Sequence, residues 1–378
     1  MIYDLAIIGG GVWGSAAAQE AVRAGGKSVL LLEKGIGLAQ ESSAKSGGIL
    51  TDLLWHPEDQ EFVTRSRVLY REARELSGDA SVAREFGQLT LAEREYADQL
   101  HRREADLSAR GVRFEMIGKD EIERRYPNLD RLREGTVGMW TPDDWHVNPT
   151  AFAQAVVDRA REGGLTLRAG CRAETIHAED QKVVIEAGGE RFEAARVLVS
   201  AGTWSRKLVR TAGFDIAMRP YRVQLSSLQL AQPHALPIVW HLQTDVYMVP
   251  EGPQNILAGD GTRLWEHDPD DYQQTGDDEF RMNIAERLLD LSSLGDSAGL
   301  RSSWAGLGGA TPDRRPLLGP LTERLFTACG DNGIGVMRGP AVGELAARVA
   351  LGLAEVPHLR PDRFPPTDFE IRPGFTLD

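Results

Sequence analysis

The chain has 378 residues, 42% of them apolar, with 43 Lys and Arg against 56 Asp and Glu and a formal net charge of −13. This composition argues against disorder, and the acidic balance argues against nucleic acid or an anionic membrane as a partner. The length predicts two or three structural units. Because the start lacks the features of a signal peptide and no apolar run approaches the roughly 20 residues of a membrane span, we expect a cytoplasmic protein.

The cysteines and histidines indicate no metal centre. Cys171 and Cys329 are far apart in the sequence and lack a metal-ligand spacing, so they predict neither a zinc site nor a disulfide framework and fit a reducing compartment. The eight histidines form no ligand cluster in the sequence. We interpret His146 and His241 as structural residues.

The amino-terminal segment has the pattern of a dinucleotide-binding unit. Two short apolar runs, predicted as buried strands, enclose an alanine-rich predicted helix: residues 4–8, 28–33 and 15–24. Gly9, Gly11 and Gly14 follow the first strand in the spacing G-x-G-x-x-G, and Glu33 ends the second strand. Strand, glycine turn, helix, strand and acid together predict dinucleotide binding.

Each part of this motif has a physical role. Gly9 permits a sharp turn, Gly11 lets the backbone approach a pyrophosphate, and Gly14 lets the helix pack closely on the sheet. The first helical amides, at Val12 and beyond, face the phosphate charge. Glu33 can accept hydrogen bonds from both ribose hydroxyls and repels a 2′-phosphate, which disfavours NADP. NAD and FAD both stay open on this motif alone.

The later elements predict an α/β chain interrupted by a β-rich insert. Predicted helices cover residues 58–78, 93–111, 149–163 and 280–291. Predicted strands cover residues 165–167, 183–185 and 196–200, and residues 216–260 alternate as in an antiparallel sheet. Residues 266–279 hold seven acids and no Lys or Arg, which predicts a solvated loop before the last of these helices. This order indicates a discontinuous nucleotide-binding domain with an inserted substrate domain.

Four segments resemble those of the FAD-dependent D-amino-acid oxidase family, which includes glycine oxidases, sarcosine oxidases and amino-acid dehydrogenases. They are the Ser- and Gly-rich stretch 42–48, the strand end 199–204, the block 304–319 and the glycine-rich loop 330–336, followed by a helix expected from about Ala341. Together they span most of the chain in the family's order. The resemblance implies an α/β fold with an FAD-binding Rossmann-like domain of the glutathione-reductase type (residues 1–85, 136–215 and 313–378) and an antiparallel-sheet substrate domain (86–135 and 216–312).

The resemblance also implies that the chain binds FAD without a covalent bond, because the usual attachment residues are missing. The residues expected at FAD are Gly9, Gly11, Val12, Trp13, Gly14, Glu33, Lys34, Ser42, Ser43, Ser46, Gly47, Gly48, Ala173, Ala201, Gly202, Trp204, Gly330, Asn332, Gly333, Ile334, Gly335 and Val336. A helix that starts after the last of these residues aims free amides at the flavin pyrimidine edge, where the reduced flavin carries negative charge.

For chemistry, the resemblance implies hydride transfer from an amine-bearing carbon of an amino acid or related amine to flavin N5, giving an imine that hydrolyses. Tyr247 matches a tyrosine on the substrate side of the flavin. The family's carboxylate-binding arginine is replaced by Gly308, and family members often have histidine where Asp331 stands. A charged hydrogen bond of that kind contributes roughly 1.5–3 kcal/mol, so we expect Arg222 or Arg338 to substitute, or a substrate that lacks an α-carboxylate.

Two other functions stay open. Oxidation of a hydroxyacid or alcohol C–O bond needs a base, for which His241 and His56 are the candidates. A flavin-binding subunit that needs a partner for activity is the other possibility. No basic residue lies within residues 255–259, where the oxygen-activating residue of sarcosine oxidases is expected, and this favours a dehydrogenase or a slow oxidase over a fast one.

Overall fold

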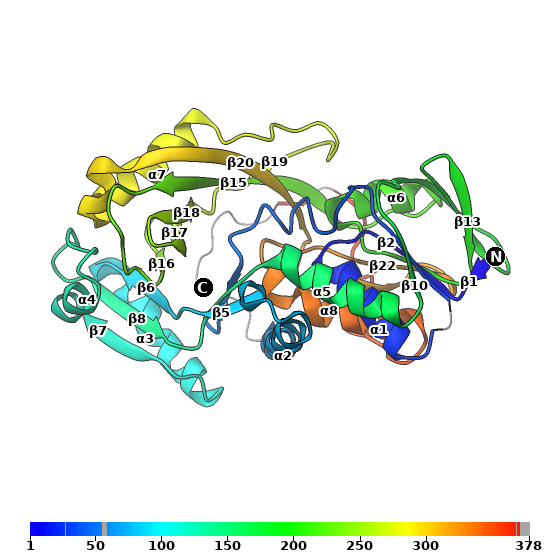
Figure 1. Cartoon of the computed structure of the whole chain (residues 1–378), viewed down its shortest axis with the longest axis horizontal. Coiled ribbons are helices and arrows are strands. Elements are labelled where there is room, and N and C mark those ends of the chain that lie inside the picture. Colours follow the sequence, from blue (N-terminus) through cyan, green and yellow to red (C-terminus); the bar gives the residue numbers. More distant parts are fainter. Residues whose placement is uncertain (27, 55–58, 368, 371–378) are drawn as a thin grey trace.

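The computed structural model describes residues 1–26, 28–54, 59–367 and 369–370. His56, a candidate base, lies outside these residues. The molecule is elongated, with a mainly parallel sheet and its covering helices at one end and a large antiparallel sheet at the other (Figure 1). Helices α1, α5 and α8 lie together at the first end, and α3 and α4 lie at the second.

The parallel sheet joins segments that are far apart in the sequence. Its order is β10-β3-β2-β14-β22-β21, and only β21 runs antiparallel to its neighbour. The strands are Leu5–Ile8 (β2), Val29–Leu32 (β3), Leu165–Arg168 (β10), Val197–Val199 (β14), Leu317–Pro320 (β21) and Leu325–Cys329 (β22). The helices on this half are Val12–Arg23 (α1), Gln60–Ser77 (α2), Pro149–Glu162 (α5), Ser205–Thr211 (α6) and Gly335–Ala350 (α8). Both β2 and β3 are buried at every residue, as expected of strands covered on two faces.

The antiparallel sheet has nine strands in the order β19-β15-β18-β17-β16-β6-β8-β7, with β20 paired to β15. Its strands pair antiparallel except β16 and β6, which run parallel. Its strands are Gln88–Ala92 (β6), Glu115–Gly118 (β7), Val137–Thr141 (β8), Arg219–Gln229 (β15), Ile238–His241 (β16), Val246–Gly252 (β17), Asn255–Gly259 (β18), Leu264–Trp265 (β19) and Gly299–Ala310 (β20). Helices Arg94–Ala109 (α3), Lys119–Arg125 (α4) and Asp278–Leu291 (α7) accompany them. Strand β8 pairs with both β6 and β7, so residues 137–141 lie in this sheet.

Two small sheets complete the strands. One has the order β1-β13-β12-β11 and the other β4-β9-β5. They consist of Ile2–Tyr3 (β1), Ala173–Ala178 (β11), Val183–Ala187 (β12) and Glu190–Ala194 (β13), and of Ile49–Leu50 (β4), Ala83–Glu85 (β5) and Trp145–Val147 (β9). Strand β4 follows the Ser- and Gly-rich stretch and fixes its end against β9.

The carboxy-terminal helix begins earlier than the sequence predicts. The expected start at Ala341 is wrong, because α8 begins at Gly335 and includes Pro340 in its interior. Proline has no N–H, so the Val336 carbonyl loses its helical partner, and the Tyr70 hydroxyl donates to that carbonyl at 2.9 Å instead. A side chain of α2 thus donates to the carbonyl that the proline leaves without a helical partner. The local sequence of α8 does not reveal this contact.

Helices α1 and α8 cross at very short range. A Cβ on Gly343 would overlap the Trp13 carbonyl oxygen, and one on Gly339 would lie 2.5 Å from Trp13 Cδ1. The Trp13 indole Nε1 donates to the Gly335 carbonyl oxygen at 2.7 Å. These contacts bring the amino ends of both helices to the same side of the parallel sheet.

We predict that Gly343→Ala destabilises the protein by about 1–3 kcal/mol, because the new methyl group overlaps the backbone of α1. Alanine normally stabilises a helix relative to glycine. A loss of stability would therefore be opposite to the effect of helix propensity and would reflect the overlap. Denaturant unfolding of both proteins measures the change. Gly299→Ala is the control, since nothing lies within 4 Å of its Cβ position. A Gly343→Ala variant as stable as this control would contradict the close crossing.

Candidate functional site

Two adjoining cavities of about 220 and 360 Å³ lie at the carboxyl ends of the parallel strands. Their walls share Gly11, Ser42, Ser43, Ser200 and Gly202, so they form one continuous groove. The smaller cavity reaches the antiparallel sheet, and the larger one lies beside Glu33 and the strands that flank it. A long groove at this edge of an open parallel sheet is the usual site for a dinucleotide.

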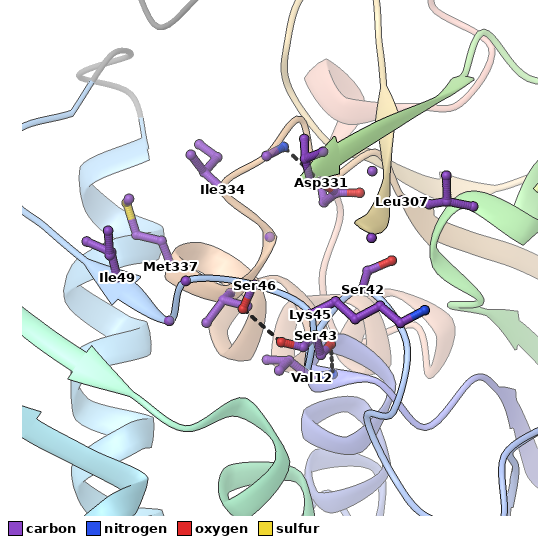
Figure 2. A pocket seen from close by; sticks show the side chains of 18 of the residues that line it. Val12, Ser42, Ser43, Lys45, Ser46, Ile49, Leu307, Asp331, Ile334 and Met337 are labelled. Atoms are coloured by element: carbon purple, nitrogen blue, oxygen red, sulfur yellow. Dashed lines mark hydrogen bonds between the residues drawn. The ribbon is translucent and has the colours of Figure 1, made fainter. Parts of the chain in front are cut away.

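The amino end of α1 fits a phosphate group. Gly11 has open space around its Cβ position, with only the Ser43 hydroxyl nearby at 3.4 Å. The Val12 amide donates to this hydroxyl at 3.3 Å, and the Ser46 hydroxyl donates to the Ser43 carbonyl at 2.7 Å. Figure 2 shows Val12, Ser43 and Ser46 joined by these bonds, while Asp331 and Ile334 extend from the loop before α8. The serine-rich stretch therefore lines the groove where the dinucleotide phosphates are expected.

Glu33 is buried at the other end of the groove and already accepts two backbone hydrogen bonds. Its Oε2 accepts from the Gly10 amide at 2.6 Å and its Oε1 from the Gly35 amide at 2.7 Å. Burial raises the pKa of Glu33, and these two amides and Lys34 oppose that rise. A carboxylate has about four acceptor positions, so two remain for ribose hydroxyls.

The loop before α8 is shaped by its own side chains. Asp331 accepts the amides of Gly309 at 2.7 Å and Gly333 at 2.9 Å, and burial raises the pKa of this carboxyl. Asn332 has a φ of 52° and donates to the Gly330 carbonyl at 2.8 Å. Its carbonyl oxygen accepts from the Thr311 amide at 2.8 Å, which ties the loop to the end of β20.

Of the residues predicted at FAD, all except Gly14 and Asn332 line the groove. Gly14 instead packs on the motif itself, where a Cβ would overlap the Gly9 carbonyl oxygen. This is the close packing that the spacing predicts, so Gly14 shapes the turn that Gly9 begins. Asn332 likewise shapes its loop. The direct FAD contacts of the lining residues remain predictions.

The structure does not bring Arg222 or Arg338 to the cavity, so neither is retained as a carboxylate-binding cation. Arg222 pairs with Glu266 at 3.1 Å and with Asp277 at 3.0 and 3.1 Å. Arg338 is fully buried and pairs with both oxygens of Asp59 at 2.9 and 3.1 Å. Neither side chain is among the lining residues. Both guanidinium groups hold segments of the fold together.

The antiparallel sheet supplies the opposite wall of the cavity. Tyr247 lies there as expected, with its ring between the backbones of Gly47 and Gly259. Side chains that the sequence did not single out join it: Gln88 from β6, Tyr221 and Gln224 from β15, and Trp240 from β16. Only the pairing of these strands brings them together, and no local motif marks them. The wall combines aromatic surface with neutral hydrogen-bonding groups.

The acidic stretch is not simply a solvated loop. We call residues 266–277, between β19 and α7, the acidic strap. Asp270 of the strap lines the larger cavity and accepts hydrogen bonds from Arg172 at 2.8 Å, Trp204 at 2.8 Å and Lys207 at 2.6 Å. The strap's Tyr272 hydroxyl lies 2.8 Å from Lys45 Nζ. The stretch is a mostly exposed loop before α7, as predicted. The contacts of Asp270 and Tyr272 were not predicted, because their partners come from distant segments of the chain.

Other expectations concern metals, membranes and thiols. Within the described ranges, no three His, Cys, Asp or Glu side chains gather as a metal site, and no helix there is long and apolar enough to cross a membrane. Cys329 lines the cavity, and burial raises the pKa of its thiol to about 12. It therefore stays protonated at neutral pH, and non-covalent binding of the cofactor remains the prediction.

A model of the FAD-dependent oxidoreductase family that includes D-amino-acid oxidase matches residues 4–349. The chain belongs to this family. The match confirms the predicted cofactor, FAD, and the oxidoreductase class.

Known relatives agree with this assignment. A glycine oxidase from Geobacillus kaustophilus is 27% identical over 355 residues, which cover 91% of this chain and 92% of that protein. A D-amino acid dehydrogenase from Xanthobacter autotrophicus is 26% identical over 284 residues, 74% of this chain and 66% of that protein. The crystal structure of glycine oxidase from Geobacillus kaustophilus superposes with a TM-score of 0.85 at 24% identity, covering 96% of this chain and 99% of that one. This confirms the predicted fold class.

We predict that Glu33→Gln raises the Kd for FAD about ten- to a hundredfold, because hydrogen bonds to a charged group contribute roughly 1.5–3 kcal/mol. Fluorescence titration of the apoprotein with FAD measures it. Glu174→Gln, an exposed acid on the same cavity wall, is the charge-matched control. The substitution also changes the two contacts that Glu33 makes with backbone amides. Thermal unfolding of the wild-type and variant apoproteins shows whether losing those contacts, and not ribose binding, accounts for a change. An unchanged Kd would show that Glu33 does not hold the ribose.

A second prediction concerns the acidic strap. Asp270→Asn should speed FAD dissociation about fivefold, as expected for a partly exposed ion-pair network of roughly 1 kcal/mol. Asp271→Asn, which removes the same charge from an exposed neighbour, should not.

Salt and pH should affect the same contact. Although partial burial opposes them, hydrogen bonds from Lys207, Arg172 and Trp204 hold the pKa of Asp270 below its ordinary value. The strap contacts are thus present above about pH 4 and weaken as the pH falls further. High salt and acid should therefore increase the rate of FAD release, followed by fluorescence. The increase should be larger in the wild type than in Asp270→Asn. Equal responses would contradict a role for the strap.

Proposed function

We propose that this protein uses FAD to oxidise the C–N bond of an amino acid or a related amine. The observation that carries the proposal is the continuous groove, which joins two helix amino ends to an aromatic and neutral polar wall of the antiparallel sheet. The names of the relatives support it, since glycine oxidase and D-amino acid dehydrogenase both denote amino-acid oxidation. When bound, FAD would supply the acceptor for the hydride that leaves the substrate carbon.

The chain's own residues would hold the substrate and exclude water. Tyr247, Trp240 and Gln88 line the side opposite the helix ends and can orient an amine carbon toward the flavin. A neutral amine that loses hydride becomes an iminium ion. Water then adds to the carbon and releases the carbonyl product and the amine. The proposal needs no side-chain nucleophile, since the cofactor provides the electron acceptor.

The described histidine named as a candidate base for C–O oxidation does not lie in the described wall. His241 lies elsewhere, with its Nδ1 2.9 Å from the Thr244 hydroxyl, and the described lining residues include no histidine. We propose a cytoplasmic location, consistent with two buried cysteines that are not joined in a disulfide. The net charge of −13 disfavours a nucleic-acid partner.

The test is anaerobic reduction of the purified flavoprotein by a panel of amino acids, N-methyl amino acids, amino-acid amides, simple amines and hydroxyacids. We predict that the flavin absorbance bleaches with at least one amine and with no hydroxyacid. Repeating the reaction with oxygen and with a dye as acceptor separates an oxidase from a dehydrogenase. Bleaching by hydroxyacids alone would overturn the C–N assignment. A flavoprotein that no compound bleaches would indicate a subunit that needs a partner.

A further inference from the structure

The cavity wall that faces the substrate has no cation available for a carboxylate. Among the described residues that line it, Lys45 and Asp331 are the only members of the Lys, Arg, His, Asp and Glu types. The Lys45 ammonium is paired with Glu41 at 3.1 Å and donates to the Tyr272 hydroxyl at 2.8 Å. Asp331 is an acid, so it offers no positive charge, and it accepts the Gly309 amide. A substrate carboxylate would therefore be buried without a free counter-charge, which is costly.

Tyr221 occupies the place where a large side chain at position 308 would begin. Tyr221 in β15 is the antiparallel partner of Gly308 in β20. A Cβ on Gly308 would overlap the Tyr221 ring and lie 2.5 Å from its hydroxyl oxygen. The space next to Gly308 is thus filled by a neutral phenol.

The Tyr221 hydroxyl is buried in the cavity wall. The residue is 0% exposed, and its oxygen makes no hydrogen bond of normal length and angle with any described residue. Burial and the neighbouring Asp331 carboxyl, through its charge and a side-chain hydrogen bond outside those limits, raise the pKa of Tyr221 above its usual range. The phenol therefore keeps its proton and can donate a hydrogen bond. Because Asp331 satisfies this buried donor only in part, a ligand oxygen that accepts from it would lower the cost of burying it.

Arg263 lies behind this phenol. Its guanidinium carbon is 5.4 Å from the centre of the Tyr221 ring, and the residue is not among those that line the cavity. Its positive charge opposes the rise in the pKa of Tyr221. A nearby cation makes a phenol a stronger hydrogen-bond donor, so Arg263 acts on the substrate through Tyr221.

We propose that Tyr221 recognises the substrate by donating a hydrogen bond to a neutral acceptor, so that the site selects an amine whose neighbouring group is an amide or ester carbonyl and not a free carboxylate. This inference rests on the proposed amine oxidation and names its substrate class. A phenol can satisfy a carbonyl oxygen with one hydrogen bond, whereas a buried carboxylate needs a cation as well.

The first experiment measures binding without turnover. Isobutyramide and isobutyrate have the shape of an amino-acid amide and an amino acid but lack the amine, so they cannot be oxidised at a C–N bond. Titrating each into the holoenzyme and following the flavin absorbance spectrum gives their Kd values. We expect the amide to bind at least tenfold more tightly than the carboxylate. Equal or tighter binding of isobutyrate would overturn the proposal.

The second experiment uses matched substrates. Sarcosinamide and prolinamide should reduce the flavin anaerobically at least tenfold faster than sarcosine and proline at equal concentration. Faster reduction by the acids in both pairs would overturn the proposal. If none of the four bleaches the flavin while isobutyramide still binds more tightly than isobutyrate, amine oxidation fails but recognition by Tyr221 stands.

Variants test the role of Tyr221 directly. Tyr221→Phe should weaken isobutyramide binding about three- to tenfold and leave isobutyrate unchanged. Tyr126→Phe, at the end of α4 and not among the lining residues, should change neither. The double variant Tyr221→Ala with Gly308→Arg makes room for a cation and should reverse the preference toward isobutyrate. Unchanged amide binding in Tyr221→Phe would overturn the proposal. If the wild type binds isobutyrate and Arg263→Met abolishes that binding, then Arg263 binds the carboxylate. This result would also overturn the proposal.

Discussion

Close packing of α1 on α8 is the constraint on which the site depends. The backbone of Gly343 and Gly339 lies directly against Trp13, at a distance that no larger side chain allows. This crossing places two helix amino ends, each the positive end of a helix dipole, beside one groove. One end suits the pyrophosphate of FAD, and the other suits the negative charge of its reduced ring. The family match supplies the cofactor that this geometry is built to hold.

The antiparallel sheet completes the groove and is fixed to the cofactor half by charge pairs. The acidic strap extends from the sheet to the larger cavity, where Asp270 meets three donors, and its Asp277 pairs with Arg222. Arg338 pairs with Asp59 within the cofactor half and fixes α8 to the start of α2. Arg222 and Arg338 thus hold the structure together. The substrate side keeps neutral groups, which agrees with glycine at position 308.

Local patterns predicted much of the fold and the cofactor site. The glycine spacing and Glu33 follow from short-range requirements of a strand, a turn and a helix, so the sequence displays them. The strap and the substrate wall depend on pairing between distant strands, and nothing near Tyr221 shows that it faces Gly308. The start of α8 was missed for a related reason: the partner that tolerates Pro340 is Tyr70, from another helix.

A crystal structure of the protein with bound FAD tests the central claim most directly. Our account predicts pyrophosphate oxygens within hydrogen-bond distance of the amides at the start of α1, and the pyrimidine edge of the flavin at the start of α8. The substrate side of the ring should face Tyr221 and Tyr247. A structure in which either helix start is covered by polypeptide, with FAD bound elsewhere or absent, would contradict it.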